Sequence, residues 1–507
     1  MTMAPRTLAL PPNRLAPSLL APSLLAAILV AAFVLRAVVL WTQTYVVFLD
    51  ETFQYFEQAH RVAFGNGVQP WEFIDGIRSW FLPGLIAGLM RLTTLLTDEP
   101  MAYVRLTRLL CAAASLVVVL VGYRMAERRA GLAAAILTGG LCAIWYDLIL
   151  FSPAVLTEVL ATHAALIALW LGDDGRPRRP MLAGAWFGLA FCLRYQYAPA
   201  LLAAALWQHR FEWARWRRLI VGGLAVVLPL AGMLDWVTWG TPFQSMWLNF
   251  VRNSIEGMSA AIGTDPPSFY LTYIWVSLRP APLLLALIVI GGIRAPVLGI
   301  TAAVTVIEHL AVPHKEVRFI YLAIALAPIM MGLGCATVLE SLRARFGSRA
   351  ISIGTPAALG LAALLSWTLA TTPPLMTRWA FERASLQAFA LARAQPDLCG
   401  LAVRDNFYDS GGYTYLHRDV PVYFADYDPA RVLEGTPVTM RLEIIRHGQS
   451  LPQYPGAALA GERARYNYLI AEPGHPVAGF SRMACFNDAE RDERPPLCLF
   501  SRPGGCS

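Results

Sequence analysis

The chain has 507 residues, of which 56% are hydrophobic and 15% charged, and its mean hydropathy is +0.49. These values exclude an ordinary soluble protein and indicate a membrane protein. The net charge of +7 is carried mainly by arginine-rich loops between apolar segments, so it does not indicate nucleic-acid binding. We find no internal repeat.

Apolar runs long enough to cross a bilayer recur along the first three-quarters of the chain. The first is longer than the apolar core of a signal peptide, so we expect an uncleaved anchor. The pattern predicts an all-α polytopic membrane protein with about 11 hydrophobic segments, some of them broken or re-entrant. The segments lie near 17–42, 81–97, 102–121, 130–151, 153–171, 181–207, 218–237, 276–293, 296–312, 319–340 and 351–372.

The arginines predict the orientation of these segments, because basic loops face the cytoplasm. Both ends of segment 181–207 adjoin such loops, so we expect it to turn back near Arg194, Tyr195 and Gln196 and to line a cavity there. Segment 81–97 is expected to lie along the outer face or to dip into it. The basic loops are 123–131, 172–180, 209–218 and 341–349.

This topology places the loop 43–80, the loop 238–275, the turn HKEVRF (314–319) and the tail on the outer side. We therefore divide the chain into a transmembrane domain, residues 1–372, whose outer catalytic loop is 43–80, and an outer domain, residues 373–507. The tail has helical periodicity at 379–394 and short strand-like runs at 399–405, 420–424 and 466–472. It predicts a small α/β extracytoplasmic domain.

Four of the eight cysteines lie in this tail, at Cys399, Cys485, Cys498 and Cys506. On the outer side of a membrane they indicate disulfides, with three ways of pairing. The other four lie in apolar segments, where cysteine packs as a small hydrophobic residue.

Lys315 is the one lysine of the chain among 41 lysines and arginines. Its ammonium is a compact charge, whereas arginine carries a wide planar fork, so a site beside one phosphate oxygen would favour the lysine. His314, Glu316 and Arg318 share the same turn at a membrane edge. The alternative interpretation is that one lysine remains by chance in a chain whose other basic side chains are all arginine.

Asp50 and Glu51 follow directly on the first apolar segment, at the membrane boundary, where ionisable residues are costly and usually functional. The residues from 51 to 64 have apolar and aromatic side chains at helical spacing and predict an interfacial helix. Because Asp50 directly precedes this helix, an alternative role for it is that of the N-terminal cap. A carboxylate can take a proton from an attacking hydroxyl, and cations can stabilise a leaving phosphate. Together these groups suit transfer from a lipid-phosphate carrier to a hydroxyl acceptor.

Five blocks of this sequence resemble glycosyltransferase family 22, the lipid-phosphate-mannose-dependent mannosyltransferases of GPI-anchor and N-glycan assembly, which have the GT-C fold. The resemblance extends over roughly residues 30–330, with the blocks in family order. The blocks are DETFQYFEQAHRV, PWEFIDGIRSWFLP, FCLRYQYAP, DWVTWGTPFQSMWLNFVRNS with GTDPPSFYLTYI, and HKEVRF.

The resemblance implies a single inverting displacement that transfers mannose from a polyprenyl (dolichol-type) phosphate. Asp50 is the expected general base and Glu51 the second candidate. His314, Lys315, Arg318, Arg78 and Arg194 are expected to bind the donor phosphate. Glu316, Trp71, Glu72, Tyr195 and Gln196 are the further candidates for substrate binding.

The expected partners are membrane lipid, a polyprenyl-phosphate sugar donor and a glycan or glycolipid acceptor. We expect no cofactor and no divalent metal, although the carboxylates of the outer loop are of the type that binds metals. Arginine-rich coding suggests a bacterial protein of the inner membrane, with the active site facing the periplasm. Two alternatives stay open: a GT-C enzyme for another sugar, such as arabinose or glucose, and a transporter or flippase of lipid-linked saccharides.

Overall fold

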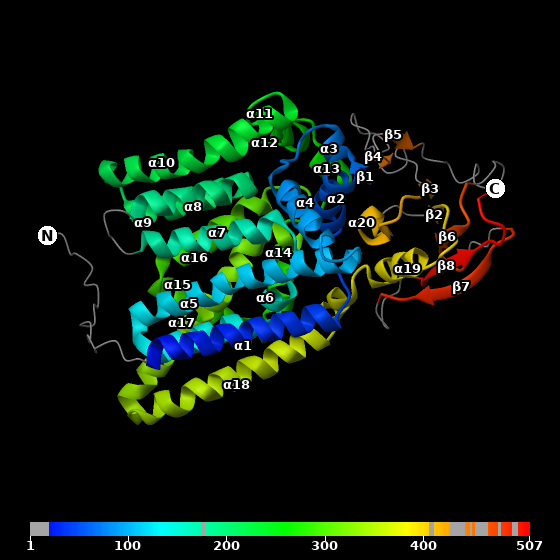
Figure 1. Ribbon diagram of the computed structural model, residues 1–507. Helices are drawn as coiled ribbons and strands as arrows, with labels where there is room; N and C mark the ends of the chain where they lie inside the picture. The colour runs from blue at the N-terminus through cyan, green and yellow to red at the C-terminus, as the bar shows by residue number, and fades with distance from the viewer. Residues whose placement is uncertain are drawn as a thin grey trace.

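The computed structural model describes residues 20–173, 179–404, 410–425, 442–446, 449–451, 465–474, 478–488 and 495–506. A bundle of roughly parallel and antiparallel helices forms most of the molecule, and a small domain with a mixed β-sheet sits at one end of it (Figure 1). We call this the domain end of the bundle.

Helices of the bundle follow the predicted apolar segments. Among the described residues, five helices are long and apolar enough to cross a membrane, or six if α14 and α15, which are bent by 100°, count as one span. The protein is therefore a multi-pass membrane protein. The bundle consists of α1 (Leu20–Thr42), α5 (Pro100–Ile144), α7 (Thr157–Gly172), α8 (Arg179–Leu193), α9 (Ala198–His209), α10 (Trp213–Val227), α14 (Phe269–Ser277), α15 (Ala281–Arg294), α16 (Pro296–Leu310), α17 (Tyr321–Phe346) and α18 (Arg349–Thr371).

One predicted pair of segments is confirmed and one predicted boundary differs from the structure. The segments expected at 102–121 and 130–151 are the two halves of α5, which fold back on each other at Gly131, where φ is 79°. Both halves contact Arg36, which donates to the Ser115 hydroxyl and to the Ala143 carbonyl, each at 3.0 Å. Glycine takes this backbone conformation without a Cβ clash, so the helix axis can change direction there. The segment expected at 276–293 begins earlier, because residues 269–277 of the predicted outer loop are helical.

The predicted turn at Arg194 is confirmed. Helix α8 ends at Leu193, Arg194 is non-helical with φ −147° and ψ 84°, and α9 begins after the 3₁₀ turn η2 (Tyr195–Tyr197). The Gln208 amide donates to the Leu169 carbonyl at 2.6 Å, so the end of α9 lies beside the end of α7. Both ends of the segment therefore lie at the same end of the bundle.

The arginine-rich loops gather at the end of the bundle opposite the domain end (Figure 1). Arg129 pairs with Asp173 at 2.7 Å, which joins the loop after the first half of α5 to the loop after α7. The Tyr123 hydroxyl donates to the Ala21 carbonyl at 3.0 Å, so the start of α1 lies there as well. This arrangement is the one that the arginines predicted.

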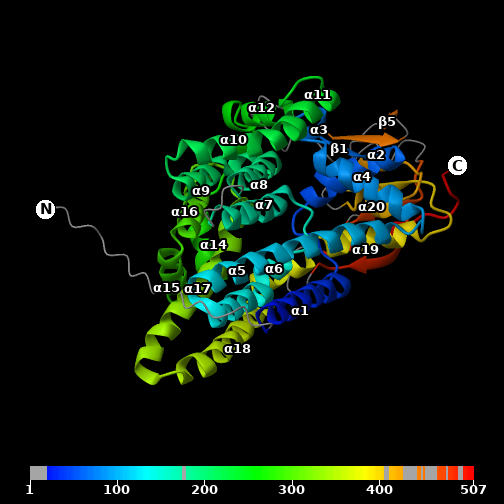
Figure 2. The ribbon, with the colours of Figure 1, turned by 60° about the vertical axis from the view of Figure 1, so that its left-hand side comes forward.

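Short elements crowd the domain end (Figure 2). The predicted helix of the outer loop is present but is not exposed at an interface, because residues 51–60 are all buried. Helix α4 has only 14 residues, which agrees with the prediction that segment 81–97 does not cross fully. The elements are η1 (Glu51–Phe56), α2 (Glu57–Phe64), β1 (Asn66–Pro70), α3 (Trp71–Ile74), α4 (Phe81–Thr94), α6 (Tyr146–Leu150), η3 (Leu228–Met233), α11 (Leu234–Trp239), α12 (Gln244–Phe250), η4 (Val251–Ile255), α13 (Met258–Ile262), η5 (Val317–Ile320) and η6 (Leu375–Ala380).

The outer domain contains the predicted helix, the three predicted strands and, among its described residues, four further strands, of which two join the predicted ones in a single sheet. Its five-stranded sheet has the order β3-β2-β6-β8-β7, in which β2 is parallel to β3 and β6 and the other pairs are antiparallel. Disulfides join Cys399 to Cys506 and Cys485 to Cys498. The elements are α19 (Arg383–Arg393), β2 (Leu401–Arg404), α20 (Gly412–Leu416), β3 (Val422–Ala425), β6 (Tyr468–Ala471), β7 (Ser481–Phe486) and β8 (Leu497–Ser501).

The first outer loop is part of this domain as well as of the bundle. Strand β1 of the loop pairs antiparallel with β4 (Leu442–Arg446), which in turn pairs with β5 (Gln449–Leu451). A division of the chain at residues 372 and 373 therefore separates two strands that share one sheet. The tail holds the predicted catalytic loop in place.

Candidate active site

A cavity of about 860 Å³ opens at the domain end of the bundle. The first outer loop, the turn between α8 and α9, the region from α12 to α13, the end of α16 and the turn 311–319 all contribute to its wall. The cavity brings together all the predicted site residues except Glu51 and Lys315. Those that line it are Asp50, Trp71, Glu72, Arg78, Arg194, Tyr195, Gln196, His314, Glu316 and Arg318.

Arg318 is the electrostatic centre of this cavity. Its guanidinium pairs with Asp50 through Nη1 and with Glu316 through Nε, and its Nε lies 3.6 Å from Oε1 of Glu158. The Arg318 side chain is only 8% exposed, whereas the Asp50 side chain is 23% exposed. Asp50, the candidate base, is thus the more accessible of the two, while the Arg318 guanidinium is held in place by its carboxylate partners.

Glu158 is a site residue that the sequence analysis missed. It lies near the start of α7, is 1% exposed, and accepts from Nη1 of Arg194 at 3.0 Å. Its carboxylate therefore fixes Arg194 and also faces Arg318. An isolated carboxylate in an apolar segment is a functional signal, and Glu158 in segment 153–171 carried that signal.

Burial raises the pKa of Asp50, and the nearby carboxylates of Glu316 and Glu158 act in the same direction, against Arg318 and Arg78. The pKa of Glu316 is lowered: burial alone would raise it, but the charge of Arg318 and the hydrogen bonds from His314 and Arg318 outweigh that effect. Asp50 is consequently the better proton acceptor of the two carboxylates.

His314 extends the charged network along the cavity wall. Its Nε2 lies 3.1 Å from Oε1 of Glu316, and its Nδ1 lies 3.2 Å from the Gly263 carbonyl. The hydrogen bond with Glu316 raises the pKa of His314, because the carboxylate stabilises the imidazolium form. His314 therefore adds a further hydrogen-bonding group to the network around Glu316.

Glu72 and Arg78 also line the cavity. The Gln54 amide donates to Oε1 of Glu72 at 2.8 Å. Burial raises the pKa of Glu72 to about 7, against the opposing charge of Arg78. Nε of Arg78 has no hydrogen-bond partner within the described part of the chain. Arg78 thus keeps a donor that an anionic ligand can use.

Amide and hydroxyl groups line the side next to the α8–α9 turn. The Tyr195 hydroxyl donates to Oδ1 of Asn249 at 2.7 Å, and Nδ2 of Asn253 lies 3.3 Å from the same oxygen. Both asparagines line the cavity together with Gln196. Neutral groups of this kind bind sugar hydroxyls, and the sequence analysis did not single out the two asparagines.

Glu51 lies away from the cavity. It is fully buried, and its carboxylate accepts the backbone N–H groups of Val47 and Val155, the latter at 2.9 Å. It therefore joins the end of α1 to the segment before α7. The structure corrects the expectation that Glu51 stands beside Asp50 as a second base.

Lys315 also points away from the cavity. Its Nζ donates to the carbonyls of Val312 at 2.6 Å, Asp265 at 3.1 Å and Pro313 at 3.4 Å. The three donors of the ammonium match three converging carbonyls, which a planar guanidinium cannot reproduce. The expectation that Lys315 faces a phosphate is therefore replaced by an architectural role in the HKEVRF turn.

Several carboxylates and histidines line this cavity. Over the described ranges of the chain, no group of three or more histidine, cysteine, aspartate or glutamate side chains is arranged to hold a metal ion. Arginines occupy the positions between the carboxylates.

Sequence and structure comparisons agree with this architecture. Residues 25–417 match the model of the Alg9-like mannosyltransferase family. A GPI mannosyltransferase 3 from Yarrowia lipolytica is 26% identical over 399 residues, 75% of this chain and 73% of its own length. A GPI mannosyltransferase 3 from Drosophila melanogaster is 50% identical over a segment of 54 residues, 11% of this chain and 9% of its own length.

Solved structures share the fold. ArnT from Cupriavidus metallidurans in the apo state superimposes with a TM-score of 0.61 at 16% identity, over 95% of this chain and 98% of its own. The structure of the same ArnT bound to undecaprenyl phosphate superimposes with a TM-score of 0.59 at 14% identity. The match covers 94% of this chain and 98% of the ArnT chain. An oligosaccharyltransferase from Archaeoglobus fulgidus in the apo form superimposes with a TM-score of 0.52 at 13% identity. This match covers 89% of this chain and 69% of the other.

The family match and the relatives, together with the shared fold, define a membrane glycosyltransferase of the GT-C class. More specifically, the chain belongs to the Alg9-like mannosyltransferase family. The protein is thus an enzyme, not a transporter of saccharides.

Proposed function

We propose that this enzyme transfers mannose from a polyprenyl-phosphate carrier to a hydroxyl group of a glycan or glycolipid. The observation that carries the proposal is the pairing of Asp50 with Arg318 at the wall of the cavity. This pair places a carboxylate of raised pKa beside a fixed cation. A base for the acceptor and a charge for the leaving phosphate are thereby within one site.

The displacement needs no covalent enzyme intermediate. The acceptor oxygen attacks the anomeric carbon, a new carbon–oxygen bond forms, and the bond from that carbon to the phosphate oxygen breaks. The electron pair of the broken bond leaves with the lipid phosphate, and the acceptor proton passes to Asp50. A single displacement inverts the anomeric configuration.

In this mechanism the phosphate would be held by Arg318, Arg194 and Arg78, and His314 lines the same cavity. Guanidinium groups suit this task because their donors match phosphate oxygens in pairs. The neutral wall of Tyr195, Gln196 and the asparagines would bind the hydroxyls, and Trp71 offers an apolar face to the sugar ring. We propose that no metal or other cofactor is required, because the arginines supply the positive charge.

Two relatives support the choice of donor and acceptor. ArnT was solved with undecaprenyl phosphate, a lipid phosphate, on the same fold. The Yarrowia relative is named for the mannosylation of GPI, a glycolipid. These are properties of the relatives, and for this chain they support the proposal.

We place the cavity on the outer, periplasmic side of a bacterial inner membrane. The arginine-rich loops cluster at the opposite end of the bundle, as expected for cytoplasmic loops. The two disulfides lie at the domain end, and disulfides persist in oxidising compartments.

A transfer assay tests the function. Purified protein is incubated with radiolabelled polyprenyl-phosphate mannose and a membrane extract, with Asp50→Asn and Asp75→Asn in parallel. Asp75 is the matched control, because it lies in the same loop, pairs with Arg252 at 3.3 Å and does not line the cavity. Label should reach a new product with the wild type and with Asp75→Asn, and not with Asp50→Asn.

Two other outcomes would change the assignment. Label that stays on the lipid with every protein contradicts the mannose donor, and a panel of polyprenyl-phosphate arabinose and glucose then tests the other sugars. Transfer by Asp50→Asn at the wild-type rate removes Asp50 as the base.

A further inference from the structure

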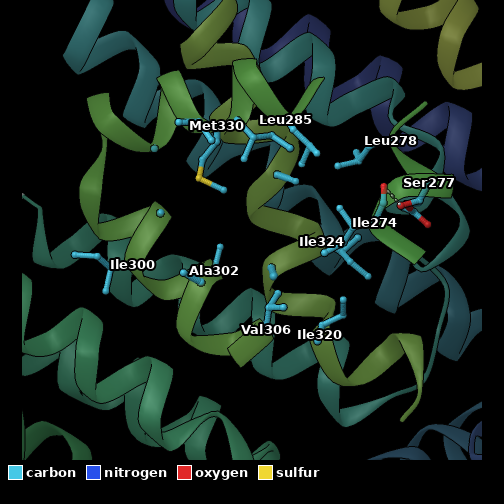
Figure 3. Close-up of a pocket in the computed structure, with 18 of the residues that line it drawn as sticks. Ile274, Ser277, Leu278, Leu285, Ile300, Ala302, Val306, Ile320, Ile324 and Met330 are labelled. Atoms are coloured by element: carbon cyan, nitrogen blue, oxygen red, sulfur yellow. Dashed lines mark hydrogen bonds between the residues drawn. The ribbon is translucent and has the colours of Figure 1, made fainter. Parts of the chain in front are cut away.

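A second hollow of about 650 Å³ lies between α14, α15, α16 and α17 (Figure 3). Among the described residues, none that lines it also lines the active-site cavity. The two are separated by a thin wall, since Phe319 lines the cavity and the next residue, Ile320, lines the hollow. We call this second hollow the apolar pocket.

The wall of the apolar pocket is almost entirely hydrocarbon. Met330 and Ile300 lie toward one end of it, and Ser277 lies at the other (Figure 3). Polar side chains are confined to the end with Ser277, where Asp147 and Tyr273 also contribute. A long apolar slot with one polar end is the shape that an amphiphile requires.

The apolar pocket faces the bilayer. Val289 and Ile293 of α15 line it, yet their side chains are 59% and 71% exposed. Because α15 belongs to the membrane-spanning part of the chain, this exposure is toward lipid. A hydrocarbon chain can therefore enter sideways.

Arg378 of η6 does not line the pocket itself but adjoins its polar end, where it bonds two lining residues. Its Nη1 donates to Oδ1 of Asp147 and to the Tyr273 hydroxyl, both at 3.2 Å. Nη2 has no hydrogen-bond partner in the part of the chain that the structure describes. The guanidinium is thus fixed in position with a donor left over, which complements an acceptor such as a phosphate oxygen.

We propose that the apolar pocket binds a glycerophospholipid of the bilayer, with one acyl chain in the pocket and the phosphate hydrogen-bonded to Arg378. This lipid is distinct from the sugar donor, whose phosphate the proposed function puts at Arg318, and only that distinction rests on the proposed function. The rings of Phe48 and Phe151 stand between the two cations. Arg318 lies 4.9 Å from the Phe48 ring, Arg378 lies 5.1 Å from the Phe151 ring, and the ring centroids are 6.4 Å apart.

Such a lipid would contact the element that positions the catalytic charge. Ile320 ends η5, the 3₁₀ turn that carries Arg318, and its side chain faces the pocket. A bound acyl chain would therefore lie against the residues that pack behind this turn. A phospholipid would be a structural component of the active enzyme, separate from its two substrates.

Native mass spectrometry of the purified full-length protein tests the proposal. The protein is released from detergent, and then titrated with dioleoyl phosphatidylethanolamine or with dioleoylglycerol, which has the same chains and no phosphate. Wild type should retain one phospholipid and should bind the phospholipid about tenfold more tightly than the dioleoylglycerol, as one hydrogen bond to a charged group predicts.

Two variants and one control make the result specific. Ala302→Phe fills the pocket and should weaken binding of both lipids about tenfold, the scale of a lost chain contact. Arg378→Gln should bind the phospholipid no better than the dioleoylglycerol. Ala357→Phe, at an exposed position of α18 outside the pocket, should bind as wild type does.

The proposal is overturned if Ala302→Phe binds both lipids like the wild type, or if Ala357→Phe loses binding equally. It is also overturned if the retained molecule is a polyprenyl phosphate, because the pocket would then hold the donor chain. These outcomes are independent of mannosyl transfer, so a failure here is distinguishable from a failure of the proposed function.

Discussion

The carboxylate of Glu57 holds Thr414 by two hydrogen bonds, from its backbone N–H at 2.7 Å and from its hydroxyl at 2.6 Å. The same carboxylate accepts the N–H groups of Val68 at 2.7 Å and Tyr413 at 3.1 Å. One buried side chain thus ties α2, β1 and α20 together. The loop that carries Asp50 is anchored by this contact to the outer domain.

Gly412→Ala should disrupt this anchor. Gly412 has φ +64°, and a Cβ at this position would lie 2.5 Å from Oε1 of Glu57. We expect a loss of about 1–3 kcal/mol in the free energy of unfolding, from backbone strain and the displaced carboxylate. Gly474→Ala is the control, because its Cβ would meet no atom within 4 Å. Equal melting temperatures of the two variants would contradict the role of Glu57.

Glu158→Gln should lower the free energy of unfolding by more than a usual polar substitution does. It leaves Arg194 and Arg318 facing each other without their shared carboxylate, and breaking a buried ion pair costs about 3–5 kcal/mol. We expect a lower melting temperature and a raised KM for the lipid donor. The exposed pair of Glu212 with Arg215 gives the control, since Glu212→Gln should change neither quantity appreciably.

Lys315→Met and Lys315→Arg should both lower the melting temperature and leave the KM for the donor unchanged. The first leaves the carbonyls of Val312 and Asp265 without their donor, and the second replaces a compact ammonium with a planar group. Thermal unfolding in detergent and steady-state kinetics provide the two readouts. A raised KM for the donor at an unchanged melting temperature would contradict the architectural role and would indicate that Lys315 binds the donor phosphate.

Glu72→Gln should stabilise the protein in alkaline buffer only. The pKa of Glu72 is about 7 in the folded protein and 4.5 as its ordinary value, so the folded state holds a proton that the unfolded state releases between these pH values. Wild-type stability therefore falls as the pH rises through this window. The melting temperature of the variant should match the wild type near pH 4.5 and exceed it at pH 8, and a difference independent of pH would refute this cause.

Local signals in the sequence predicted much of the fold and of the site. The helix break at Arg194 followed from arginine loops at both ends of one segment, and Asp50 and Arg318 followed from charges at membrane edges. These signals depend on neighbours in the sequence, so they can be read without a structure. Cysteine counting likewise predicted disulfides.

Features that depend on distant partners could not be predicted. The direction of the Lys315 side chain depends on the carbonyl of Asp265, fifty residues earlier, and the role of Glu158 depends on Arg194 and Arg318. The pairing of β1 with β4 joins short strands without a distinctive pattern. In each case the partner, not the residue itself, determines the outcome.

The pairing of β1 with β4 also has a consequence for the order of assembly. Asn66 lies opposite Arg446, so the strand within the first outer loop pairs with a strand 380 residues later in the chain. Contacts between residues so distant form late, because a long loop must close first. The helices of the bundle are therefore expected to insert before the active site forms. The site is complete only after the tail has been synthesised and has paired with the first outer loop.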